Sequence, residues 1–201
     1  MLSVIVVDYK SLDRTIKYVE MLTNQIKLQQ DVHYIVVDNY CENGDLCVAS
    51  DCDIKAMGIE YKCDKKIYRY EINGNDLVYI YSGGNMGYAN GNNLGIKVSN
   101  ELFGDDYYLV SNNDIEIHDP IDFKIIKDIF DGNGSIAVIG PKVIGLDGIP
   151  QSPNMKPTAF GNLFLTYLSM ATHDRLFKWN DVDYTGESKI CYRVMGSFMF
   201  L

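Results

Sequence analysis

The feature that most constrains the fold is a pair of continuous apolar runs near the start of the chain. Residues 2–7 read LSVIVV, and residues 32–39 read VHYIVVDN. Uninterrupted β-branched runs of this length are typical of parallel strands that are covered on both faces. Between them, residues 11–29 place apolar side chains at helical spacing, with Ser11 and Asp13 as candidate N-caps. The segment therefore predicts a βαβ unit.

The same alternation continues along the chain. Residues 76–82 and 107–111 are further strand candidates, and the stretch between them begins glycine-rich and becomes helical. The later elements that we predict are a helix over 119–130 with Asp119 as N-cap and Pro120 at its first position, a strand and hairpin over 135–151 with LDG as the turn, a helix over 159–177, and a strand within 192–201. For the 159–177 helix, core packing is favoured over a membrane or lipid contact, because apolar helical faces are common. We predict one α/β domain over residues 1–201, a Rossmann-like, mostly parallel sheet flanked by helices.

Residues 40–76 interrupt this rhythm. They are rich in Asp, Gly, Asn, Cys and Lys, and they contain short strand candidates at GIEYKC and KIYRYEI. Because long loops without secondary structure are uncommon in compact domains, we expect an inserted hairpin or a long decorated loop.

Composition narrows the function. The 201 residues carry a net charge of −9, which argues against a nucleic-acid partner and against an anionic membrane surface, because both attract basic proteins. No apolar run reaches the roughly 18 residues of a spanning helix, and the N-terminus has no signal-peptide pattern. We therefore expect a cytoplasmic protein. The five cysteines form no CxxC pair, which favours reduced thiols over a zinc site.

Acidic and amide side chains follow three of the predicted strands. These are Asp8, Asp38 with Asn39, and the triplet Asn112, Asn113 and Asp114. In an open α/β sheet, ligands bind outside the carboxyl ends of the strands. Each aspartate alone could be a helix cap, but the three together suggest a divalent cation that bridges them to a nucleotide diphosphate.

Five segments, taken in order, resemble a known family. They are VVDYKS, VVDN, GGNMGYANGNNLGI, YLVSNND and GPKVI. Their order and spacing are similar to those of the family 2 inverting glycosyltransferases of the GT-A fold, especially rhamnosyltransferase-like members of polysaccharide assembly. The resemblance covers nearly the whole chain except residues 40–76.

The resemblance implies roles for individual residues. Asp114 would hold Mg²⁺ or Mn²⁺ in the position of the DxD-type motif, Asn113 would lie by the ribose, Tyr9 would flank the base and Asp38 would read the base edge. The nucleotide-binding positions that follow from it are Val7, Asp8, Tyr9, Asp38, Asn85, Gly87, Asn93, Asn112 and Asn113. Lys10 departs from the asparagine that is common at its position.

The implied reaction transfers a sugar from a UDP-, dTDP- or GDP-linked donor to a saccharide or lipid-linked acceptor with inversion. A lipid-linked acceptor would bring the protein to the inner face of the membrane as a peripheral component. The family takes its general base from an acidic motif after the strand that matches GSFMFL, and Leu201 is reached before such a motif. We therefore expect a C-terminally truncated chain whose catalytic base is unknown.

Three other functions are alternatives to this one. A dehydrogenase would carry glycines directly after the first strand, and a nucleotidyltransferase would carry a basic glycine-rich loop there, whereas VVDYKSLDR has no glycine. The stronger alternative is a catalytically incomplete protein that binds a nucleotide sugar.

Overall fold

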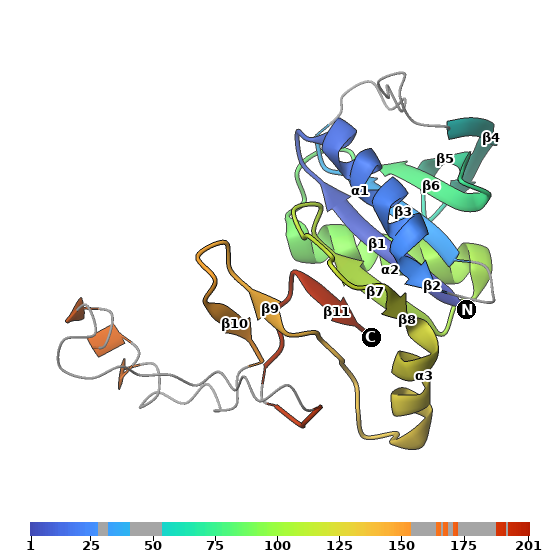
Figure 1. The fold of residues 1–201 in the computed structure, drawn as a ribbon. Coiled ribbons are helices and arrows are strands. Elements are labelled where there is room, and N and C mark those ends of the chain that lie inside the picture. Colours follow the sequence, from blue (N-terminus) through green and yellow to red (C-terminus); the bar gives the residue numbers. More distant parts are fainter. Residues whose placement is uncertain are drawn as a thin grey trace. The chain divides into compact units, whose positions relative to one another are not determined.

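The computed structural model describes residues 1–27, 32–40, 54–153, 164–165, 167–168, 171–172, 188–191 and 193–201 (Figure 1). They fall into two compact units, Met1–Ala137 with Phe200–Leu201, and Val138–Met199. The first unit holds the parallel strands and every residue of the candidate site.

A seven-stranded sheet has the order β11-β7-β1-β3-β6-β5-β4. Its strands are β1 (Leu2–Asp8), β3 (Val32–Asp38), β4 (Ile54–Lys62), β5 (Lys65–Ile72), β6 (Asn75–Tyr81), β7 (Tyr107–Ser111) and β11 (Phe198–Phe200). β7, β1, β3 and β6 are parallel neighbours, and every residue of β3 is buried. The strands that the apolar runs predicted are therefore confirmed, and the protein is a mixed α/β fold.

Two helices cover opposite faces of the parallel strands (Figure 1). They are α1 (Leu12–Gln25) and α2 (Tyr88–Phe103). Thr15 of α1 donates a hydrogen bond to Asp8, whereas a Cβ on Gly95 of α2 would lie 2.5 Å from Cγ2 of Ile5. Asp8 and Ile5 point to opposite faces of β1, because side chains alternate along a strand. The absence of a side chain at Gly95 lets α2 lie close against the sheet.

The described part of the 40–76 segment, from Ile54 onward, extends the sheet. β4 and β5 form an antiparallel hairpin, and β5 pairs antiparallel with β6. The expected hairpin is thus confirmed in the second half of this segment, over residues 54–72. Residues 41–53 lie outside the described residues. Because of this hairpin, the sheet combines parallel and antiparallel strands.

One helix begins later than predicted. The remaining elements of the first unit are β2 (Ile26–Lys27), β8 (Ile121–Asp122) and α3 (Phe123–Gly132). The N-cap of α3 is Asp122, whose carboxylate accepts a hydrogen bond from the Lys124 N–H at 3.0 Å. The predicted start at Asp119 and Pro120 is wrong, because the residues that follow Pro120 are extended and pair with β2.

The second unit contains a short hairpin. β9 (Val143–Ile144) pairs antiparallel with β10 (Pro150–Ser152) around the predicted LDG turn. The strand that was predicted to precede it is wrong, because residues 135–140 form no more than an isolated bridge. Most of the predicted 159–177 helix lies outside the described residues.

Two further findings concern the state of the cysteines and the presence of membrane-spanning helices. Cys63 and Cys191, among the described cysteines, are free thiols. In the described part of the chain, no helix combines the length and the apolar character needed to cross a membrane.

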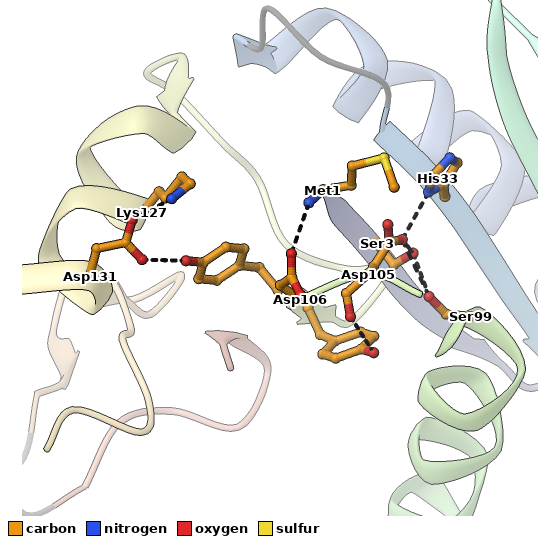
Figure 2. Close-up of polar contacts among 10 residues, drawn as sticks. Met1, Ser3, His33, Ser99, Asp105, Asp106, Lys127 and Asp131 are labelled. Carbon is orange, nitrogen blue, oxygen red and sulfur yellow. Dashed lines mark hydrogen bonds and ion pairs between the residues drawn. The ribbon is translucent and has the colours of Figure 1, made fainter. Parts of the chain in front are cut away.

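The amino ends of the parallel strands carry a buried polar network around Asp105 (Figure 2). Its Oδ2 accepts a hydrogen bond from Ser3 and lies 2.8 Å from Nδ1 of His33. Ser99 donates to Ser3 Oγ at 2.6 Å, and the ring of Phe103 stacks on His33 with centroids 3.6 Å apart. Burial alone would raise the pKa of Asp105, but the hydrogen bonds from His33 and Ser3 outweigh it and lower that pKa. We call Ser3, His33, Ser99 and Asp105 the amino-edge network.

Candidate functional site

The candidate site lies at the carboxyl ends of β1, β3, β6 and β7. The four strands are parallel, and Asp8 is paired in register with Asp38. The loops that follow these strands therefore meet at one edge of the sheet. The structure places all the predicted strand-end residues at this carboxyl edge.

Asp8 anchors the start of α1. Its side chain is 1% exposed. The carboxylate accepts hydrogen bonds from Ser11 Oγ at 2.8 Å and from Thr15 Oγ1 at 2.5 Å. The Ser11 N–H also points to it at 3.3 Å. Asp8 is not the N-cap of α1, which is Ser11, but its carboxylate orders the turn that leads into this helix.

Asp38 is likewise engaged inside the protein. It is 1% exposed, and its two carboxylate oxygens accept from the Tyr40 N–H and from the Tyr79 hydroxyl, each at 2.7 Å. A base edge could reach this carboxylate only if these bonds rearranged. In this conformation Asp38 orders the turn after β3.

Asn113 joins the loop after β7 to the start of α1. Its Nδ2 donates to Ser11 Oγ at 2.9 Å and to Thr15 Oγ1 at 2.6 Å, and it lies 3.4 Å from Asp8 Oδ1. These bonds hold the backbone that leads directly into Asp114.

Asp114 is the exposed carboxylate of the three. Burial raises the pKa of Tyr18 and of Tyr88, and the negative charge of Asp114 raises both further. Tyr18 belongs to α1 and Tyr88 is the first residue of α2. The charge of Asp114 therefore acts on one tyrosine from each of the two helices.

The donor set limits the kind of metal ion that would fit. Among the described residues, no three His, Cys, Asp or Glu side chains form a group able to hold a metal. Asp8 and Asp38 already bind protein donors, which leaves Asp114 as one exposed carboxylate. Mg²⁺ is commonly bound by one or two carboxylates together with substrate phosphates and water. Asp114 thus fits an ion that is shared with a diphosphate, not one held by the protein alone.

The start of α2 offers backbone donors. Its N-cap is Gly87, at φ 81°, with no side-chain cap and no acidic residue in the first turn. Asn85 Oδ1 accepts from the Gly87 N–H at 3.0 Å, and a Cβ on Gly87 would meet nothing within 4 Å. Uncapped N–H groups at a helix start favour anions. Asn85 and Gly87 therefore lie directly before the first turn of α2.

Val7 and Asn93 are two further positions that were predicted to bind the nucleotide. Val7 is half-buried on β1, where a Cβ on Gly91 would come within 2.9 Å of its Cγ2. Asn93 is exposed on α2, whereas its neighbour Asn92 is buried. The resemblance assigned Asn93, and not Asn92, to the loop that lines the nucleotide.

Unpaired amide oxygens gather at the carboxyl edge. Asn39 is 3% exposed and Asn92 is 6% exposed, and Oδ1 of each, like Oδ1 of Asn112, has no hydrogen-bond partner. These are three of the five such buried atoms found among the described residues. Buried polar atoms are normally paired, so three unpaired amide oxygens at the carboxyl edge distinguish this edge from the rest of the described residues. Asn39 and Asn92 were not among the predicted site residues.

The turns after β1 and β3 present an aromatic and cationic surface, the Tyr9–Lys10–Tyr40 cluster. Tyr9 and Tyr40 are 49% and 51% exposed, and their rings pack edge to face with centroids 5.7 Å apart. Lys10 Nζ lies 5.2 Å from the ring centroid of Tyr9 and 4.7 Å from that of Tyr40. Lys10 has φ 61°, a left-handed conformation that costs a non-glycine residue about 1–2 kcal/mol. Tyr40 was not predicted, because it follows the VVDN motif and belongs to no motif itself.

Comparison with known proteins gives one informative similarity. No family model matches the chain. An 89-residue segment is 38% identical to the low-salt glycan biosynthesis hexosyltransferase Agl10 of Haloferax volcanii. The similarity covers 44% of this chain and 28% of the relative's length.

Proposed function

We propose that this protein is a glycosyltransferase that transfers a sugar from a nucleoside diphosphate donor to a saccharide or lipid-linked acceptor. The observation that carries the proposal is the 38% identity, over 89 residues, to a hexosyltransferase of glycan biosynthesis. The α/β sheet supports it, because its strand-end loops bring an exposed carboxylate, an uncapped helix start and exposed aromatic rings to one edge.

The finer assignment is an inverting family 2 enzyme of the GT-A fold with hexosyl or rhamnosyl transfer. The motifs at strand ends favour it, and the parallel order of β7, β1, β3 and β6 is compatible with it. UDP-, dTDP- and GDP-linked sugars are the donors that we propose. The proposed setting is the cytoplasm, with peripheral association at the inner face of the membrane if the acceptor is lipid-linked.

Each part of the site has a distinct task in this proposal. Mg²⁺ or Mn²⁺, held by Asp114 and the donor phosphates, would neutralise the charge that develops on the leaving diphosphate. The first-turn N–H groups of α2 bind phosphate oxygens. Asn113 positions Asp114 through its bonds to Ser11 and Thr15. Tyr9 offers its ring to the base.

Calorimetric titration tests the donor site. UDP, dTDP and GDP are titrated into the protein with Mg²⁺ or Mn²⁺, and again with EDTA. We expect at least one nucleotide to bind, and to bind more tightly with the metal. Failure of all three to bind in either condition overturns the donor site, whereas equal affinities with and without EDTA overturn only the metal-binding role of Asp114.

A further inference from the structure

The exposed groups at the ends of β1 and β3 differ from those that the motifs suggested. Asp8 and Asp38 are buried, and their oxygens accept protein hydrogen bonds. Asn39 is buried too, with its Nδ2 donating to the Gly87 carbonyl at 3.2 Å. Directly after these strands, the exposed side chains are those of the Tyr9–Lys10–Tyr40 cluster.

We infer that the Tyr9–Lys10–Tyr40 cluster recognises the nucleotide base, and that Lys10 selects bases carrying an exocyclic carbonyl oxygen. This inference rests on the proposed function, because it assigns the base of the proposed donor. It makes Lys10 a specificity-determining residue and Tyr40 a contact residue.

The chemistry of the three side chains supports this assignment. Aromatic rings stack on any base, because every base has a π-face, so the tyrosines contribute affinity without choosing a base. A lysine ammonium has three donors and no acceptor. Uracil, thymine and guanine present carbonyl oxygens to such a donor, whereas the exocyclic group of adenine is an amine that also donates. The cluster therefore favours the first three bases over adenine.

Lys10 has an uncommon backbone conformation. Its φ of 61° lies in the left-handed region, which lysine adopts rarely and asparagine or glycine adopts more readily. With this backbone, Nζ lies within 5.2 Å of both ring centroids. The positive charge thus lies over both tyrosine rings, within reach of a base that packs against them. A strained residue at a ligand-binding edge is a recognised sign of function.

Binding measurements with matched nucleotides test the inference. GDP and ADP are both purine diphosphates, so their affinity ratio in Mg²⁺ reports the base edge and not ring size or phosphate charge. UDP serves as the pyrimidine probe. The proteins are wild type, Lys10→Asn, which suits the left-handed backbone, Tyr40→Ala, and Lys17→Gln as a charge control on the exposed surface of α1. Melting temperatures confirm that each variant is folded.

The expected results separate the two roles. Wild type and Lys17→Gln bind GDP and UDP about tenfold more tightly than ADP, as for one charge-assisted hydrogen bond. Lys10→Asn reduces both preferences to within about twofold. Tyr40→Ala weakens all three nucleotides by about tenfold and keeps the ratios, because stacking does not depend on the base.

Three results would overturn the inference. They are a wild type that does not prefer GDP to ADP, a Lys10→Asn variant that keeps the preference, and a Lys10→Asn variant that loses GDP and ADP affinity equally, which would place Lys10 on the phosphates. In all three cases nucleotides still bind, so the proposed function stands. Absence of binding by every nucleotide to wild type would instead overturn the proposed function together with this inference.

Discussion

The two ends of the parallel strands differ in how they treat polar side chains. At the amino ends, Ser3, His33 and Ser99 are buried around Asp105 and bonded to it or to one another. At the carboxyl ends, three buried amide oxygens lack partners, and Asp114 is exposed. One sheet therefore has a largely paired edge and an edge with unused binding capacity.

The difference separates stability from ligand binding. A paired buried network loses much when one member is removed, because the others stay buried without partners. A buried acceptor without a partner destabilises the folded state, and an exposed carboxylate contributes little to it, so groups of these two kinds are explained better by ligand binding than by stability. The division is not complete, since Oδ1 of Asp105 also has no partner.

The largest effect is expected at the amino-edge network. Asp105→Asn keeps the size of the side chain but removes the charge that faces His33 at 2.8 Å. Weakening buried hydrogen bonds to a charged group costs about 1.5–3 kcal/mol, and we expect a loss in that range in the free energy of unfolding by urea. A loss below about 1 kcal/mol would contradict the view of this edge as the stabilising one.

The counterpart at the carboxyl edge is Asp114→Asn. We expect the metal-dependent part of nucleotide binding to disappear, a weakening of at least about tenfold, with the melting temperature nearly unchanged, because the side chain is exposed. Calorimetry with Mn²⁺ and EDTA measures the first effect and thermal unfolding the second. Glu116→Gln is the matched control, since it removes an exposed carboxylate two residues away. An unfolded Asp114→Asn variant would show that Asp114 is structural.

A smaller effect concerns pH. The pKa of Asp105 is lowered in the folded protein, so its charge stabilises the fold above the unfolded-state pKa of about 3.9. This contribution is lost as the pH falls through the folded-state pKa. We expect the stability difference between wild type and Asp105→Asn to narrow below about pH 4. Urea unfolding at several pH values measures it, and a constant difference down to pH 2 would contradict the assignment.

The smallest effect is expected for Asn92→Leu. The substitution removes the hydrogen bond between Asn92 and Tyr88, which is destabilising. It also removes Asn92 Oδ1, a buried acceptor without a partner, which is stabilising. Because the two effects oppose each other, the free energy of unfolding should change by less than about 1 kcal/mol. Ser99→Ala, in the amino-edge network, is the comparison and should cost about 1–2 kcal/mol. Equal losses in the two variants would remove the distinction between the edges.

Strands β1 and β3 could be predicted because their signal is local. The continuous apolar runs at residues 2–7 and 32–39 indicate buried strands by themselves, and the observed strands match these runs closely. The start of α3 could not be predicted in the same way. Asp119 and Pro120 form a good start signal, but pairing of the next two residues with β2 prevails over it.

The sequence placed the strand-end motifs at one edge of the sheet, since this follows from the parallel order of the strands. It could not predict the state of their side chains. Whether Asp38 is free depends on Tyr79, 41 residues further along the chain, and the surroundings of Asp8 depend on Asn113, 105 residues away. Such contacts leave no local pattern. The same holds for Tyr40, which becomes relevant through its contact with Lys10.

The close approach of α2 to the sheet has a consequence for how the molecule opens. Cβ atoms at Gly91 and Gly95 would lie 2.9 Å and 2.5 Å from side-chain carbons of Val7 and Ile5. The helix therefore cannot lift away without exposing the buried side chains of β1 to water. In hydrogen exchange, the amides of α2 and β1 should be protected as one cooperative unit. Because α2 and β1 would move as one unit, the distance between the turn after β1 and the start of α2 should stay constant when the loops fluctuate.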